Sequence, residues 1–468
     1  MRRSVSSNPL KVSVVLLALL AGCGAKDELP PNILLISIDS LRADHLGCYG
    51  YERPTSPAID ALAEEGVVFE EAISQAPWTL PSHASLLTSL YGRTHQTNDI
   101  SRQLPHGIPT LSGTLSEAGY ETSAVVSGTF MQTRFGLNSG FAHYDDDIAQ
   151  FDHRRSHEAV TSPEIQRKAE ALLSGAQEPF MLFLHYWDVH YDYAPPPPYD
   201  TKFDPDYTGK VSSKGFLKNK RIEAGMPAAD LDHVVALYDG EIAWVDEHIG
   251  RLLATLEATG LDERTIVILT ADHGDEFFEH GGKGHSHSLY RELVNVPLIV
   301  RGPGVTAGGR VSTPVELIDI MPTVLELTGV RAPDGLQGRR LGAALSGGGL
   351  PAQPVFSETT RARVKKPDPW RESWSVQHDA MKLIRHGKGP SGEPARATEL
   401  YDLAADAKEL SSLGPSDARG GQLEAALERW LARTPLGPGA LNRGVDAGTI
   451  KQLRAHGYLG DEDEDDED

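Results

Sequence analysis

Apolar runs and amphipathic stretches alternate along most of the chain. Five apolar runs predict strands buried on both faces, at 32–40, 122–128, 179–186, 264–274 and 296–302. Between them, segments 56–66, 237–260 and 316–329 place apolar residues at helical spacing, with Ser56 as an expected N-cap and Gly260 as an expected stop. This alternation predicts an α/β fold with a mostly parallel sheet covered by helices on both faces.

Composition divides the chain into two folded parts. The glycine-rich segment 346–354 interrupts the pattern. We therefore expect a large domain over 32–345 and a small α+β subdomain over 352–460. A chain of 468 residues is long enough for both.

The first residues have the features of an export signal. Arg2, Arg3 and Lys11 flank an apolar run too short to span a bilayer comfortably, and small residues follow. The end of this segment resembles a bacterial lipobox, which implies cleavage after residue 22 and lipidation of Cys23. We expect residues 1–22 to be a signal peptide, 23–31 a tether, and the mature protein to be a lipoprotein of the bacterial cell envelope, on the outer membrane.

The formal net charge is −22, and residues 461–468 are all acidic. This tail is expected to be disordered and self-repelling. An acidic body argues against nucleic acid as a partner. The chain holds two cysteines, so once Cys23 carries lipid, Cys48 has no disulfide partner.

Polar residues follow three of the predicted strands directly. Asp39 ends the first run, and Asp272 and His273 end the fourth, while His185, Asp188 and His190 follow the third. Ligands of open α/β sheets bind beyond the carboxyl ends of strands, so these side chains are expected to converge. Two carboxylates, an imidazole and a hydroxyl suit one divalent metal, calcium, manganese or zinc.

A helix is expected to begin near Thr79, with Thr79 itself at the N-cap. A helix N-terminus favours anions, and a hydroxyl beside a metal can attack a bound anionic ester. His83 lies one turn further on the same face, where it could contact that hydroxyl or the ester oxygens.

Segments 31–92 and 269–304 resemble the sulfatase family of the alkaline phosphatase superfamily, and 381–387 and 398–413 resemble its small C-terminal subdomain. The resemblance covers nearly all of 31–460 and implies an alkaline-phosphatase-like fold. By position, it implies that Asp39, Asp272, His273 and Thr79 are metal ligands. It also implies that His190 and His285, with Lys283 close by, contact the ester or leaving group.

Two features depart from the family's pattern. Its nucleophile motif, C/S-x-P-x-R, yields formylglycine, whereas Thr79 and His83 occupy the first and last positions here. The family's later Lys-x-His pair is replaced by a segment that offers Ser127 and Thr129. Threonine is the nucleophile in phosphoryl-transferring branches of the superfamily, so this replacement shifts weight toward phosphoesters or phosphonate esters.

Three functions fit these residues. The first is a metal-dependent hydrolase of sulfate or phosphate esters, with Thr79 as nucleophile, His83, His190 and His285 at the ester, and a second substrate-binding set. That set comprises Lys283, His185 and Thr129. The others are a phosphoryl-group transferase acting on a surface glycan or lipid, and an inactive glycan-binding lipoprotein. A second metal could use Asp188, His190, His285 and His287.

Overall fold

The computed structural model describes residues 29–150, 161–360, 372–387, 397–414, 417–437 and 448–451. The expected signal peptide 1–22, Cys23 and the acidic tail 461–468 lie outside these residues. Among the helices that are described, none has both the length and the apolar character that crossing a membrane requires.

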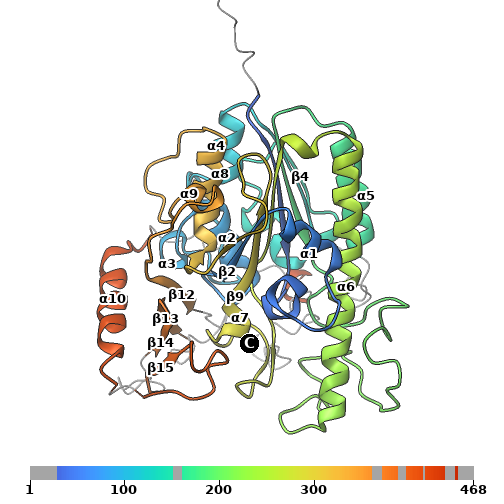
Figure 1. Cartoon of the computed structure of the whole chain (residues 1–468), viewed down its shortest axis with the longest axis vertical. Helices are drawn as coiled ribbons and strands as arrows, with labels where there is room; N and C mark the ends of the chain where they lie inside the picture. The colour runs from blue at the N-terminus through green and yellow to red at the C-terminus, as the bar shows by residue number, and fades with distance from the viewer. Residues whose placement is uncertain are drawn as a thin grey trace, which may run out of the picture.

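A nine-stranded sheet forms the centre of the molecule, in the order β10-β2-β9-β6-β1-β5-β3-β4, with β11 beside β2 (Figure 1). Its strands are β1 (Asn32–Ile38), β2 (Val67–Ile73), β3 (Glu121–Val126), β4 (His143–Asp145), β5 (Phe180–Tyr186), β6 (Thr265–Ala271), β9 (Asn295–Arg301), β10 (Gly309–Val311) and β11 (Val315–Glu316). Only β9 runs antiparallel to its neighbours, β2 and β6. The prediction of a mostly parallel α/β sheet is confirmed.

The register of the central strands brings their carboxyl ends together. Ile38 at the end of β1 lies opposite Ala271 of β6 and Tyr186 of β5. The next residues, Asp39 and Asp272, therefore leave neighbouring strands side by side. Every residue of these three strands is buried, which explains why they read as continuous apolar runs.

Helices cover both faces of the sheet, with α1, α5 and α6 on one side and α2, α4 and α8 on the other (Figure 1). Their bounds are α1 (Pro57–Glu64), α2 (Thr79–Thr88), α3 (Gly92–His95), α4 (Leu111–Glu117), α5 (Thr161–Ser174), α6 (Ala228–Ala258), α7 (Arg291–Val294), α8 (Ile320–Leu327) and α9 (Gly342–Leu345).

Three local details differ from the sequence patterns. Strand β2 was not predicted, because Glu70 and Glu71 interrupt its apolar run. Helix α6 begins at Ala228, well before the expected 237. Ser56 occupies the N-cap of α1, but its hydroxyl makes no capping bond, and Asp246 of α6 instead accepts from the first free N–H groups of α1.

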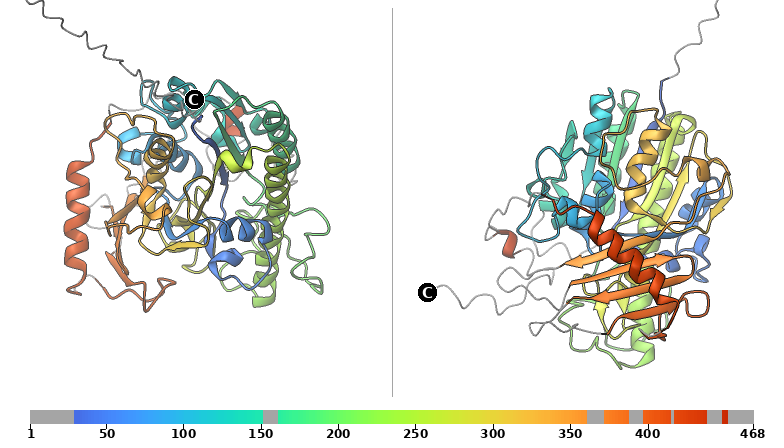
Figure 2. Two further views of the ribbon diagram at one scale, coloured as in Figure 1. Left: turned by 45° about the horizontal axis from the view of Figure 1, so that its top comes forward. Right: turned by 90° about the vertical axis from the view of Figure 1, so that its left-hand side faces the viewer.

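The C-terminal subdomain is a four-stranded antiparallel sheet covered by one helix (Figure 2). Its elements are β12 (Val355–Thr360), β13 (Glu372–His378), β14 (Met381–His386), β15 (Glu399–Asp402) and α10 (Gly420–Arg433). Tyr91 and Ile318 of the large domain share one apolar cluster with Phe356 and Trp430 of the subdomain. The two parts therefore pack as one body.

Candidate active site

Two carboxylates and an imidazole gather where β1 and β6 end. His273 Nε2 lies 3.6 Å from Asp39 Oδ1 and 3.4 Å from Asp272 Oδ2, and all three side chains are fully buried. The backbone N–H groups of Ser40 and His273 donate to Asp272 Oδ1, at 3.2 and 2.9 Å. This leaves Asp272 Oδ2 without a hydrogen-bond partner.

The Thr79 hydroxyl lies against this cluster. Its Oγ1 is 3.4 Å from Asp39 Oδ2 and 3.3 Å from His273 Nε2. The expected N-cap role of Thr79 is wrong by one residue, because Trp78 takes the extended N-cap conformation and Thr79 is the first helical residue. The hydroxyl turns toward the carboxylates instead of capping its own helix.

Burial makes it costly for the side chains of this cluster to carry a charge. Burial and the neighbouring Asp272 raise the pKa of Asp39 well above its usual range, and burial raises the pKa of Asp272 to about 6. Burial also lowers the pKa of His273 to about 4. A divalent cation among these groups would offset the cost of the buried carboxylates, and Asp272 Oδ2 offers it a free ligand atom. The oxygen and nitrogen donors at Asp39, Asp272, His273 and Thr79 therefore fit such an ion.

His185 lies among the possible ligand atoms. Its Nδ1 bonds to the Ser127 carbonyl at 2.7 Å, and its Nε2, which has no hydrogen-bond partner, is 3.5 Å from Asp39 Oδ2. The ring is fully buried. His185 is therefore placed to support the carboxylate of Asp39. The contact with substrate that was expected for His185 fits this position less well.

His83 lies beneath the cluster with both ring nitrogens occupied. Nδ1 bonds to the Thr79 carbonyl and Nε2 to the Ser37 hydroxyl, each at 2.9 Å, and burial lowers the pKa of the ring. These bonds require the tautomer that donates from Nδ1 and accepts at Nε2. The two bonds of His83 hold the first turn of α2 against β1. They do not match the direct contact with the ester that was expected for His83.

A second group of side chains borders the first. His285 Nδ1 bonds to Asp275 Oδ1 at 2.6 Å, and the Tyr193 hydroxyl donates to Asp275 Oδ2 at 2.7 Å. The His285 ring lies 4.2 Å from the ring of His273 and 5.0 Å from that of His190, measured between centroids. The structure thus brings His190 and His285 together beside the cluster. Asp275 and Tyr193 were missed by the sequence reasoning, although Asp275 stands two residues after His273.

Four other candidates have different surroundings from those expected. Lys283 Nζ donates to the carbonyls of Asn219 and Ile222, so it fastens a loop. Asp188 accepts from the Ser162 N–H at 2.8 Å and from Thr161 at the start of α5, which leaves it a helix-capping role instead of the second-metal role.

His287 bonds to Glu276 Oε2 at 2.7 Å and to the His285 carbonyl, so it too is engaged in holding its own loop. Thr129 is buried in a short 3-10 turn. The next residue, Phe130, packs against Trp78 at the start of α2. The structure gives none of these side chains a contact with the carboxylate cluster.

Tyr238 of α6 fixes the backbone beside Asp39. Its hydroxyl donates to the Ser40 carbonyl at 2.8 Å and accepts from the Arg42 N–H at 2.9 Å. Ser40 has a positive φ of 58°, which is unfavourable for a serine and needs such support. No sequence signal distinguished this tyrosine from the other apolar-face residues of α6.

The loop after the cluster is bound to the C-terminal subdomain. His280 Nδ1 bonds to Glu292 at 2.7 Å, and His280 Nε2 donates to the Glu409 carbonyl at 2.9 Å. The Glu409 carboxylate in turn accepts from the Arg291 N–H and pairs with Lys382 at 2.7 Å. Residues 276–292 therefore depend on Glu409 for their position.

This contact predicts a pH-dependent stability. Burial alone would lower the pKa of His280, but the bonds and charge of Glu292 outweigh it and raise the pKa to about 9. A raised histidine pKa stabilises the fold fully below the unfolded value, near 6.5, and this stabilisation is lost as pH rises through about 9. The melting temperature of His280→Gln should lie about 2–4 °C below wild type at pH 6.

The difference in melting temperature between wild type and His280→Gln should disappear by pH 10, as measured by scanning calorimetry. His378→Gln, at the partly exposed end of β13, is the control and should show no such closing gap. A gap of constant size from pH 6 to pH 10 would contradict the assigned protonation of His280.

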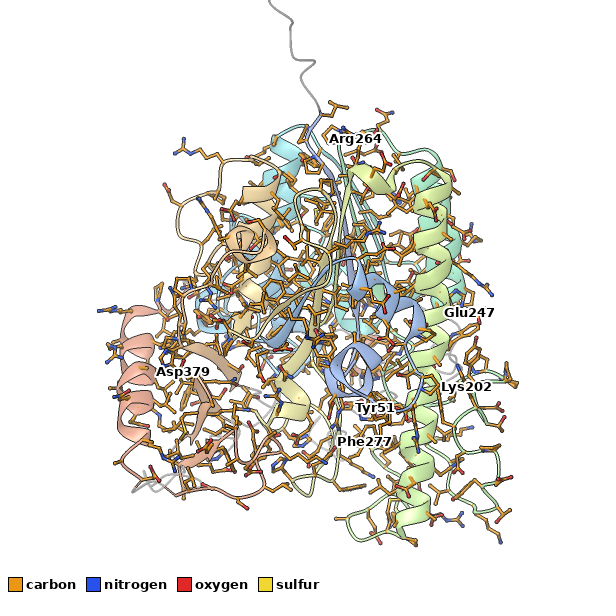
Figure 3. The ribbon with its side chains drawn as sticks, in the orientation of Figure 1. Tyr51, Lys202, Glu247, Arg264, Phe277 and Asp379 are labelled. Atoms are coloured by element: carbon orange, nitrogen blue, oxygen red, sulfur yellow. The ribbon has the colours of Figure 1, made fainter. Side chains whose placement is uncertain are left out.

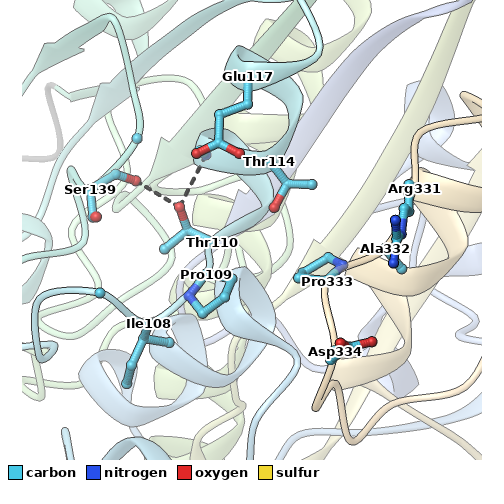
Figure 4. A pocket seen from close by; sticks show the side chains of 13 residues that line it. Ile108, Pro109, Thr110, Thr114, Glu117, Ser139, Arg331, Ala332, Pro333 and Asp334 are labelled. Atoms are coloured by element: carbon cyan, nitrogen blue, oxygen red, sulfur yellow. Dashed lines mark hydrogen bonds between the residues drawn. The ribbon is translucent and has the colours of Figure 1, made fainter.

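A hollow in the described part of the surface is remote from this chemistry. It has a volume of about 530 Å³ and lies beside α4, where the Thr110 hydroxyl donates to the Ser139 carbonyl at 2.9 Å (Figure 4). Helix α4 leads into the start of β3, whereas the catalytic candidates follow strand ends. Figure 3 shows the two ends of β6 well apart, with Arg264, just before the strand, near the top of the view and Phe277, shortly after it, in the lower half. Residues around this hollow form no part of the candidate site.

Comparisons with known proteins identify sequences and folds that this chain is similar to. The Sulfatase family model matches residues 31–330, and the N-sulphoglucosamine sulphohydrolase C-terminal model matches 279–434. A Delta 4,5-hexuronate-2-O-sulfatase of Bacteroides thetaiotaomicron is 26% identical, over 84% of this chain and 86% of that protein. The solved phosphonate monoester hydrolase of Silicibacter pomeroyi is 23% identical, with a TM-score of 0.71 over 87% of this chain and 96% of its own. A solved 2-O GAG sulfatase has a TM-score of 0.68 at 23% identity, over 86% and 92% of the two chains.

Proposed function

The chain belongs to the sulfatase family, and we propose that it cleaves its anionic ester with Thr79 as the nucleophile, supported by a divalent metal at Asp39, Asp272 and His273. The family membership makes the chain a hydrolase of the sulfate ester class. The observation that carries the finer proposal is the placement of the Thr79 hydroxyl against Asp39 and His273, at 3.4 and 3.3 Å.

Asp39, Asp272 and His273 would hold the metal through oxygen and nitrogen atoms, and the Thr79 hydroxyl beside them would be a fourth ligand. A divalent ion at this position would lower the pKa of the Thr79 hydroxyl and neutralise charge on the ester oxygens. Ser40 and Tyr238 keep the Asp39 backbone in place, while His83 fixes the first turn of α2. These contacts keep the nucleophile oriented without movement of the fold.

Two displacements complete the reaction. Thr79 gives up its proton, for which the Asp39 carboxylate at 3.4 Å is the acceptor, and its Oγ1 bonds to sulfur or phosphorus as the bond to the leaving-group oxygen breaks. The leaving oxygen takes a proton from His285 or His190. A water molecule then attacks the same sulfur or phosphorus atom, Thr79 Oγ1 departs and regains a proton, and the products are an alcohol and an inorganic anion.

His285 is the better supported proton donor of the two. Its Nδ1 is held by the Asp275 carboxylate, so Nε2 is the ring nitrogen that would give a proton to the leaving group. Asp275 is held in turn by the Tyr193 hydroxyl. Such a carboxylate fixes both the tautomer and the orientation of an imidazole, so Asp275 is a positioning residue.

Asp275→Asn should lower kcat by about 10–100-fold with little change in KM, because the substrate is still bound but the proton donor is misoriented. Steady-state kinetics across pH 5–9 provide the measurement, since loss of the carboxylate must also move the limb of the profile that reports His285. Combining Asp275→Asn with His285→Ala should add little to either single effect.

The exposed carboxylate Glu263 provides a matched control, and Glu263→Gln should leave the kinetics unchanged. An Asp275→Asn variant that raises KM alone, with an unshifted pH profile, would contradict the positioning role.

The relatives narrow the substrate class that we propose. The matched Bacteroides thetaiotaomicron proteins are named for hexuronate 2-O-sulfate and N-acetylglucosamine 6-O-sulfate, so a sugar sulfate is the first ester to test. Thr79 argues for testing phosphorus esters beside it. A sulfated threonine has no aldehyde to collapse to, so water must attack at sulfur, whereas a phosphorylated threonine is resolved by a second in-line displacement.

Thr79 also favours a second candidate function, transfer of the phosphoryl group to an alcohol instead of water. The discriminating experiment follows turnover of sulfate monoesters, phosphate monoesters, phosphate diesters and phosphonate monoesters by metal-reconstituted protein, with and without added glycerol. Hydrolase action predicts a free anion at all glycerol concentrations. Transferase action predicts a glycerol ester that grows at the expense of the free anion.

We also propose that the protein acts in the cell envelope, anchored through Cys23. The motivating observation is the lipobox-like sequence before that cysteine. Expression in a bacterium fed labelled palmitate should give a labelled wild-type protein and an unlabelled Cys23→Ser variant. Labelling of both proteins, or of neither, would refute the anchor.

A further inference from the structure

One segment of this acidic protein is strongly basic. Residues 210–221, here called the basic loop, contain five lysine or arginine residues and no carboxylate, in a chain whose net charge is −22. The five are Lys210, Lys214, Lys218, Lys220 and Arg221. All five are exposed. A local excess of positive charge on an otherwise negative protein attracts anions to that place.

The basic loop is fastened directly to the strand that precedes His285. Lys283 of β8 (Lys283–Gly284) donates to the carbonyls of Asn219 and Ile222. Leu217 of the loop packs against Gly284 so closely that a Cβ at Gly284 would lie 2.9 Å from its side chain. The loop is thus a neighbour of the residue before His285.

Aromatic stacking joins the loop to the site from a second direction. The Phe216 ring stacks on Tyr191 with centroids 5.8 Å apart, and Tyr191 stacks on His285 at 5.0 Å. The carboxylate of Asp192 accepts from the N–H groups of Gly215 and Phe216, at 2.6 and 2.8 Å. These bonds fix the backbone at the middle of the loop relative to the segment that contains Tyr191 and Asp192.

The cations point away from this anchored side. Phe216 is fully buried, whereas Lys214, Lys220 and Arg221 on either side of it are exposed. Arg221 bonds to the Lys210 carbonyl, and within the described residues none of these three cations pairs with a carboxylate. These three cations can therefore bind a ligand without first breaking an ion pair.

We propose that the basic loop binds further anionic groups of a polyanionic glycan whose scissile ester lies at Thr79. The inference rests on the proposed function, because it needs an ester at that site. A substrate with a single small anionic group, bound at Thr79, would leave the exposed cations of the loop without an anionic partner. An anionic lipid surface is the competing occupant, but it would gain nothing from the loop's attachment to the strand before His285.

The test compares two triple variants of the full chain that lose the same charge. The first, Lys214→Gln/Lys220→Gln/Arg221→Gln, neutralises the basic loop. The control, Arg331→Gln/Arg340→Gln/Arg429→Gln, neutralises three exposed arginines elsewhere, one of them in the hollow beside α4. Binding of dextran sulfate is measured by calorimetry at several salt concentrations, and turnover is measured with 4-nitrophenyl sulfate and 4-nitrophenyl phosphate.

We expect the loop variant to bind dextran sulfate about tenfold more weakly than wild type at low salt, with a shallower salt dependence. Its turnover of the nitrophenyl esters should stay within about twofold of wild type, because those substrates do not reach the loop. The control variant should match wild type in both measurements.

Equal losses in the two variants would overturn the proposal, since they would show only an effect of net charge. Binding to vesicles of anionic phospholipid that disappears in the loop variant, while dextran sulfate binding persists, would overturn it in favour of a lipid surface. Failure of wild type to turn over any ester would instead refute the proposed function, and the dextran sulfate measurement would still stand on its own.

Discussion

Thr79→Ala should abolish ester turnover almost completely, by about 10³–10⁶-fold in kcat, because it removes the atom that attacks sulfur or phosphorus. The hydroxyl is fully buried at the start of α2, and only Asp39 and His273 of the cluster lie beside it. No other hydroxyl of α2 contacts both Asp39 and His273. The measurement is steady-state hydrolysis of the best substrate from the ester panel.

Two companion variants separate chemistry from folding. Thr88→Ala removes a buried hydroxyl from the other end of the same helix, where it donates to the Ala84 carbonyl at 2.6 Å, and should retain activity. Thr79→Ser keeps the nucleophilic oxygen and should retain measurable turnover. A covalent adduct on the peptide that contains Thr79, trapped by rapid acid quench and mass spectrometry, would identify the attacking atom directly. Unchanged activity in Thr79→Ala would remove the proposed mechanism altogether.

Loss of one metal-binding carboxylate should be nearly as severe. Asp272→Asn should lower kcat/KM by at least about 10²-fold and weaken metal binding, because the amide supplies no negative charge to the ion. Treatment of wild type with a chelator should give the same loss, and calcium, manganese or zinc should restore it. Metal content by mass spectrometry provides a readout independent of turnover.

Asp246→Asn provides the matched control for that experiment. Asp246 is also a buried carboxylate, but it accepts from two N–H groups of α1 and faces no metal-binding residue. Its loss should reduce stability by about 1 kcal/mol through the helix N-terminus and leave the metal content unchanged. Full activity in metal-free protein would refute the assignment of Asp39, Asp272 and His273 as ligands.

The sequence could predict the cluster of Asp39, Asp272 and His273 because two neighbouring strands, β1 and β6, end there. Asp39 and Asp272 follow apolar runs whose pairing places their ends together, so the strand pattern alone brings the two carboxylates to one edge. His273 is adjacent to Asp272 and shares that position. No side-chain conformation had to be known for this part of the prediction.

The second group of residues depended on conformations that spacing does not determine. His83 has the spacing expected for a contact beside Thr79, yet its ring bonds back to the Thr79 carbonyl and to Ser37. Lys283 is close to His285 in sequence, but its long side chain reaches the opposite way, to the carbonyls of the basic loop. Asp188 and its neighbour His190 serve different purposes, because Asp188 caps a helix that begins more than twenty residues earlier in the chain.

The bond network around Glu409 has an evolutionary consequence. The C-terminal subdomain supplies one carboxylate that holds Arg291 and Lys382, and its backbone holds His280 in the loop that leads to His285. The subdomain cannot therefore be exchanged between relatives as an independent module. A functional chimera would have to inherit residues 276–292 and the segment around Glu409 from the same parent.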